Sequence, residues 1–228
     1  MENASKALIM AGSVLIALMI IGALLLMFNS LTSYQDTNTQ GEREAQVIEF
    51  NNQYETYNRD DVRGSDVISL INRIIDYNAR KNAEGYTEMQ IEININDVTK
   101  FKYDNNSEGF IRSKYTQNNL TELVGTINNK KSPKGLEEKY NESYIRKLSS
   151  NISNIIDGDD QKATKKIEEI LPKKIDDYDG LEQIKSDTLI YYQYSQFKRA
   201  HFKCTKTEYD EKTGRIINMQ FEFTGKFN

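Results

Sequence analysis

The sequence predicts an α+β protein: an N-terminal transmembrane helix that continues into an amphipathic helix, followed by a small head of mixed helices and antiparallel sheet. Three observations predict this fold. Residues 7–28 contain no ionisable side chain and are almost all apolar. Beyond them, apolar residues recur at helical intervals of three and four in several segments, and alternate at the period of a strand in others. Helices that precede most of the strands favour an α+β head.

These patterns divide the chain into four parts. They are a short N-terminal flank at 1–6, a transmembrane helix at 7–29, a linker and amphipathic helix at 30–60, and an α+β extracytoplasmic domain at 61–228.

Composition excludes several classes of protein. The chain has 228 residues, a net charge of -4, one Cys, one His and no Trp. A lone Cys excludes an intrachain disulfide scaffold and a Cys-rich zinc site. The acidic balance argues against a nucleic-acid binder. The mean hydropathy of -0.69 blends the apolar N-terminal segment with a more polar remainder, so the average hides two different environments.

The apolar segment has the length of a membrane span. At 1.5 Å per residue, residues 7–28 make a helix of about 33 Å, close to a hydrocarbon core of about 30 Å. A cleaved secretory signal and a buried core helix are the alternatives. A signal has a shorter apolar core of about 7 to 15 residues and a small-x-small cleavage site, which this segment lacks. A core helix is rarely apolar around its whole circumference, so a retained anchor is favoured.

Flanking charges predict the orientation of this anchor. Lys6 and the α-amino group precede the segment, and Arg43 is the only basic side chain soon after it. The positive-inside rule states that basic flanking residues stay on the cytoplasmic side of the membrane. It predicts a signal-anchor in the cell membrane with the C-terminal domain outside the cytoplasm.

The predicted helix also carries a stripe of small residues. The stripe recurs at spacings of four and three and comprises Ala7, Ala11, Leu15, Leu18 and Gly22. Small residues let helices approach closely in lipid, so Ala7, Ala11, Leu18 and Gly22 are candidates for transmembrane helix packing. The alternative is that Ala and Gly are simply common in membrane helices.

The spacing of apolar residues and the positions of turn and cap residues predict the elements that follow the anchor. Residues 30–44 form a linker or a weak helical continuation, after which Val47, Phe50, Tyr54 and Tyr57 have helical spacing. Residues 58–64 break this helix. A second helix starts at Ser65 or Asp66 and ends near Gly85.

Strand patterns follow the second helix. Residues 89–96 alternate strictly, which predicts a half-buried strand, and residues 110–115 are its candidate hairpin partner.

The second half of the chain predicts two more helices and a hairpin. One helix runs over 140–156 up to Gly158, and another over 160–171 up to Pro172. Residues 189–209 are rich in Tyr, Phe and Thr, which predicts a strand. Apolar and polar residues alternate over 215–227, which predicts a second strand. The turn between them contains Gly214, so a C-terminal hairpin is expected.

No catalytic constellation stands out. His201 and Cys204 lie three residues apart, which places them on opposite faces of a strand and argues against a nucleophilic pair. The acidic clusters 157–160 and 176–180 lack the spacing of a calcium loop and are better explained as turns and caps. The lysine run is more typical of a solvated helix face than of a nucleic-acid patch; it comprises Lys162, Lys165, Lys166, Lys173 and Lys174. The tyrosines Tyr191, Tyr192 and Tyr194 are more typical of sheet packing. We therefore expect neither enzymatic activity nor a cofactor or metal.

An apolar N-terminal helix, an amphipathic continuation and an α+β head that ends in strands resemble the bacterial type IV pilins and pseudopilins. The resemblance covers the architecture of most of the chain and has no specific motif. It implies a structural or assembly subunit of a surface or secretion apparatus, whose helix packs in the bilayer against copies of itself and whose partners belong to that assembly, without nucleic acid. The alternative is a membrane-anchored extracytoplasmic binding module that recruits a protein or a small ligand.

Overall fold

The computed structural model describes residues 2–84, 87–104, 109–125, 129 and 131–227, and within the helices the side chains of 2–9, 11, 31–42 and 81–84 lie outside the description. The chain separates into two compact units, Met1–Phe50 and Asn51–Asn228. The predicted end of the second helix at Gly85 lies outside the described residues.

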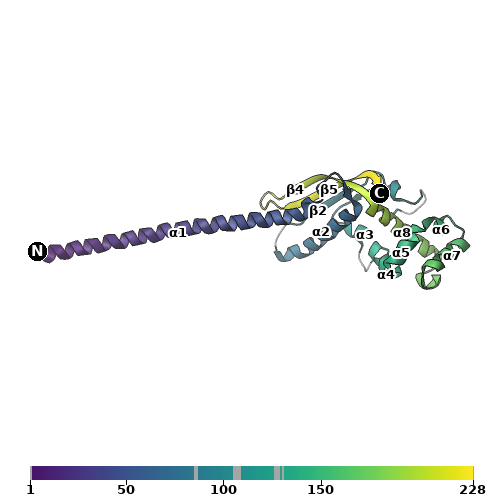
Figure 1. Cartoon of the computed structure of the whole chain (residues 1–228), viewed down its shortest axis with the longest axis horizontal. Helices are drawn as coiled ribbons and strands as arrows, with labels where there is room; N and C mark the ends of the chain where they lie inside the picture. The colour runs from purple at the N-terminus through teal and green to yellow at the C-terminus, as the bar shows by residue number, and fades with distance from the viewer. Residues whose placement is uncertain (1, 85–86, 105–108, 126–128, 130, 228) are drawn as a thin grey trace. The chain divides into compact units, whose positions relative to one another are not determined.

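The first unit is a single long helix (Figure 1). Helix α1 runs without a break over Glu2–Glu55, so its last turn belongs to the second unit. Within it, Gly12–Ser30 is long and apolar enough to cross a membrane, with a mean hydropathy of 2.3. The segment 30–44, for which a linker or a helical continuation was expected, is helical.

The second unit contains a five-stranded sheet in the order β1-β4-β5-β2-β3. The strands are β1 (Val62–Arg63), β2 (Gln90–Asn94), β3 (Lys114–Tyr115), β4 (Ala200–Tyr209) and β5 (Ile216–Phe227). The predicted hairpins exist as the antiparallel pairs β2–β3 and β4–β5, although only the last two residues of the predicted strand 110–115 are paired.

The prediction of an antiparallel sheet is wrong at its centre, because β2 and β5 pair in parallel. A parallel pair needs a long crossover connection. Here the chain between the two strands includes helices α3 to α8 and strand β4. The sheet is therefore mixed, and its central pairing joins segments that are far apart in the sequence.

Helix α2 (Gly64–Glu84) packs against strands β1, β2 and β4 of the sheet and also against helix α8 (Leu181–Arg199) (Figure 1). The alternation predicted for 89–96 is confirmed: Met89, Ile91, Ile93 and Ile95 are all buried. From β5, Met219, Phe221 and Phe223 join this core. The hydrophobic effect of burying these side chains is the main force that holds the layers together.

Short helices follow β3 and form the rest of the unit: α3 (Leu120–Val124), α4 (Pro133–Tyr140), α5 (Glu142–Ser150), α6 (Ile152–Ile156) and α7 (Asp160–Ile170), with 3-10 turns η1 (Val98–Phe101) and η2 (Ile175–Tyr178). The predicted helix at 160–171 is confirmed as α7. The predicted single helix over 140–156 is wrong, because the chain breaks at Asn141, where φ is 67°, and again at Asn151. Asn side chains compete for backbone hydrogen bonds, and Asn141 Oδ1 accepts from Ser143 N at 3.0 Å.

The start of the C-terminal strand also differs from the prediction. Residues 189–199 are the end of α8, and β4 begins only at Ala200. Tyr191, Tyr194 and Phe197 are spaced by three and are all buried, so they mark one face of a helix rather than of a strand. Tertiary burial outweighed the strand propensity of these aromatic residues.

Candidate functional site

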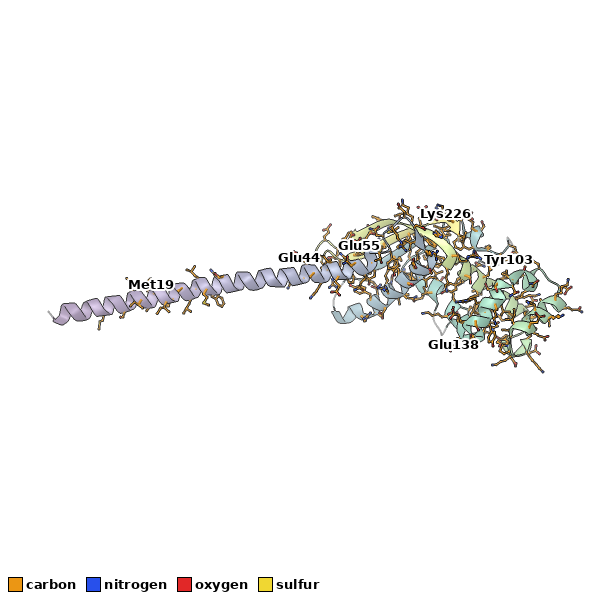
Figure 2. All side chains as sticks on the ribbon, in the orientation of Figure 1. Met19, Glu44, Glu55, Tyr103, Glu138 and Lys226 are labelled. Atoms are coloured by element: carbon orange, nitrogen blue, oxygen red, sulfur yellow. The ribbon has the colours of Figure 1, made fainter. Side chains whose placement is uncertain are left out.

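The exposed apolar surface of α1 is the most unusual feature of the first unit. Large apolar side chains from Met10 to Phe28 are 54% to 72% exposed. Figure 2 shows the side chains around Met19 projecting away from the ribbon. An apolar surface of this extent marks a site of contact with a membrane or another protein. A helix suits lipid because it satisfies its own backbone hydrogen bonds.

The predicted packing stripe lies on this helix. Leu18 is exposed, and a Cβ placed on Gly22 would meet no atom within 4 Å. The side chains of Ala7 and Ala11 lie outside the described part of the chain, although their backbone is helical. The described part of the stripe therefore faces open space within one copy of the chain.

A second feature, which the sequence patterns did not reveal, ties the last turn of α1 to the C-terminal hairpin. The side-chain amide of Asn51 donates to Gly214 O, and its oxygen accepts from Ile216 N, both at 2.9 Å. Tyr209 donates its hydroxyl to Glu55 at 2.6 Å, and Tyr54 is buried. The helix end is therefore held at the turn between β4 and β5, close to the position labelled Glu55 in Figure 2. The sequence patterns marked Tyr54, by its helical spacing, and Gly214, as part of the predicted turn, but not the hydrogen bonds between these elements.

The loop after α1 is fastened to β4. Cys204 N donates to Arg59 O at 3.0 Å, and Lys203 pairs with Asp60 at 2.9 Å. Nδ1 of His201 is hydrogen-bonded to Asp61, and this bond holds the pKa of the Asp61 carboxyl below its ordinary value.

His201 and Cys204 do not form a reactive pair. The Cys204 sulfur is buried and contacts Lys206 O and Thr207 Oγ1, both at 3.6 Å. The imidazole of His201 contacts Asp61 instead. The two side chains thus have separate partners, and the geometry supports structural roles for both.

The two acidic clusters serve as helix caps, ion pairs and turns. Asp159 caps α7 by accepting from Lys162 N at 2.8 Å, and Asp160 pairs with Lys185 at 2.7 Å. Asp157 accepts a hydrogen bond from the Tyr103 hydroxyl, which raises the pKa of that tyrosine to about 12. Among the described residues, no group of three or more His, Cys, Asp or Glu side chains is arranged to hold a metal ion.

The second cluster surrounds a turn. Asp179 adopts a left-handed conformation with a φ of 67°, and its carboxylate pairs with Lys139 at 3.0 Å. The predicted turn at 176–180 is therefore present, and the Asp179 carboxylate has a structural partner.

Part of the lysine run lines a polar cavity between α6 and α7. The cavity has a volume of about 590 Å³ and includes Lys162, Lys165 and Lys166. Asp157 and Glu169 line it too, and Lys166 pairs with Glu169 at 3.0 Å. Positive and negative charges therefore alternate here, as expected for a solvated helix face.

A buried charged cluster lies among α4, α8 and η2. Asp187 is 1% exposed and accepts three hydrogen bonds: from Tyr140 Oη at 2.8 Å, from Lys139 Nζ at 3.0 Å and from Gln183 Nε2 at 2.7 Å. Burial, together with the nearby Asp187 charge, raises the pKa of Tyr140. Burial opposes the charged form of Lys139, but hydrogen bonds to Asp179 and Asp187 outweigh it and raise its pKa.

The geometry of this cluster supports a structural role, in which it stabilises the contact of α4 with α8 and η2. Every oxygen of the Asp187 carboxylate has a donor, and Tyr140 stacks on Tyr178 with ring centroids 5.0 Å apart. A fully satisfied buried network holds its elements in one arrangement. Sequence reasoning missed it, although the spacing of Gln183 and Asp187 on one helix face is a local signal.

No protein-family model, curated protein or solved structure matches this chain. The function proposed below therefore rests on the residues and the geometry alone.

Proposed function

We propose that the chain is a non-enzymatic, single-pass membrane protein and a pilin-like structural subunit of a surface or secretion assembly. The observation that carries this proposal is the bare apolar segment Gly12–Ser30, which has none of its residues buried. In water such a helix needs a cover, and lipid together with neighbouring copies of the helix supplies one.

The dimensions of the segment support a membrane span. Its 19 residues correspond to about 28 Å of helix, close to the thickness of a hydrocarbon core. Lys6 before the segment favours a cytoplasmic N-terminus and a C-terminal domain outside the cytoplasm. A cleaved signal is the competing function of such a segment, and the intact mass of the protein recovered from cells distinguishes the two.

The geometry of α1 supports assembly as the role of the anchor. The helix continues from the apolar segment to Glu55. Asn51, one turn before this end, is hydrogen-bonded to the hairpin of the second unit. Gly22 adds a position where the backbone of a second helix can approach closely.

The experiment compares two glycine variants of the full chain in membranes. Gly22→Leu places a large side chain on the stripe, whereas Gly12→Leu places one about 80° away around the helix. Neither glycine has an atom within 4 Å of its added Cβ, so neither variant clashes within the chain. We expect chemical cross-linking into oligomers to fall about tenfold for Gly22→Leu, which corresponds to a loss of about 1.4 kcal/mol, and to persist for Gly12→Leu.

The same preparations test the anchor itself. Both variants and the unmodified chain should remain in the membrane pellet after extraction at alkaline pH. Release of the unmodified chain into the supernatant would overturn the membrane anchor. Retention in the pellet without oligomers of the unmodified chain would instead favour the alternative, a monomeric anchored binding module.

A further inference from the structure

We draw no further inference here: the strongest candidate, the cavity of about 490 Å³ that Arg112, Glu122, Lys131 and Ile190 line beside α3 and α8, carries nothing, because nothing in the structure shows what would fill it.

Discussion

Gly64 and Phe197 bring two helices of the second unit into backbone contact. A Cβ atom built on Gly64, the first residue of α2, would lie 1.7 Å from the carbonyl oxygen of Phe197 near the end of α8. Real Cβ atoms do not approach an oxygen so closely, and the opposing atom belongs to the backbone, which cannot turn away. Only glycine fits where α2 starts.

Gly64→Ala should therefore destabilise the second unit by about 3 kcal/mol, at the upper end of the usual cost of overpacking. Urea unfolding of the full chain in detergent, followed by tyrosine fluorescence because the chain lacks Trp, measures this loss. Gly109→Ala is the matched control, since its added Cβ would have only an ordinary contact at 3.5 Å with Lys102. Equal stability of the two variants would show that α2 and α8 are farther apart than described.

The two hydrogen bonds of Asn51 should stabilise the junction between α1 and the hairpin. Asn51→Ala leaves Ile216 N and Gly214 O without their side-chain partner, at an expected cost of about 2 kcal/mol. Asn52→Ala removes the same chemical group from an exposed neighbour and should change stability by less than about 0.5 kcal/mol. Urea midpoints of the two variants provide the comparison, and a junction held by other contacts would make them indistinguishable.

Among the charged side chains that the structure describes, Asp187 should be the one whose removal lowers the free energy of unfolding most. Asp187→Ala leaves Lys139 and Tyr140 without their shared acceptor and should destabilise the second unit by about 3 kcal/mol. Asp177→Ala, at an exposed position of η2, is the control. Thermal unfolding monitored by circular dichroism distinguishes them. A small effect of Asp187→Ala would mean that water replaces the carboxylate and that the cluster is open to solvent.

Alkaline pH should unfold the second unit through its buried tyrosines. Burial raises the pKa of Tyr115 and Tyr194 to about 12 from an ordinary value of 10.0. The unfolded chain releases these protons first, so the stability that they contribute is complete below pH 10 and is lost as the pH rises towards 12. Each such group lowers the unfolding free energy by at most about 1.4 kcal/mol per pH unit in this range.

Tyr194→Phe tests this pH dependence, because phenylalanine cannot ionise. Its stability should decline less steeply than that of the unmodified chain between pH 10 and 12, and should match it at neutral pH. Urea unfolding at several alkaline pH values gives the slope. Identical slopes would mean that Tyr194 ionises as readily in the folded chain as in the unfolded one.

Local patterns predicted those elements whose periodicity agrees with their burial. Ile91 and Ile93 alternate with polar residues and line the core, as expected. In β5 the alternation slips at its start, where Ile216 is buried and Ile217 is only half-buried. A register irregularity between Glu208 and Tyr209 accounts for this shift, and such irregularities leave no signal in a single sequence.

In other elements two local preferences compete, and tertiary packing or a capping side chain decides between them. Tyr191 and Tyr194 suit a strand by propensity and a helix by spacing, and burial against α4 and α5 selects the helix. Asn141 interrupts an apolar pattern that continues through it, because its side chain caps the next helix. The candidate features divide in the same way: the apolar N-terminal helix is visible in the sequence, whereas the hydrogen bonds of Asn51 and Asp187 are not.

The sequence by itself determined the apolar N-terminal helix, the α+β class, the C-terminal hairpin and helix α7, because each depends on residues that are neighbours in the chain. Tertiary structure alone decided the parallel pairing of β2 with β5, the contact of Gly64 with Phe197 and the burial of Asp187. The physical reason is that these three depend on partners far apart in the sequence. Their free energies arise from close packing and from buried hydrogen bonds, and neither term is encoded in local periodicity.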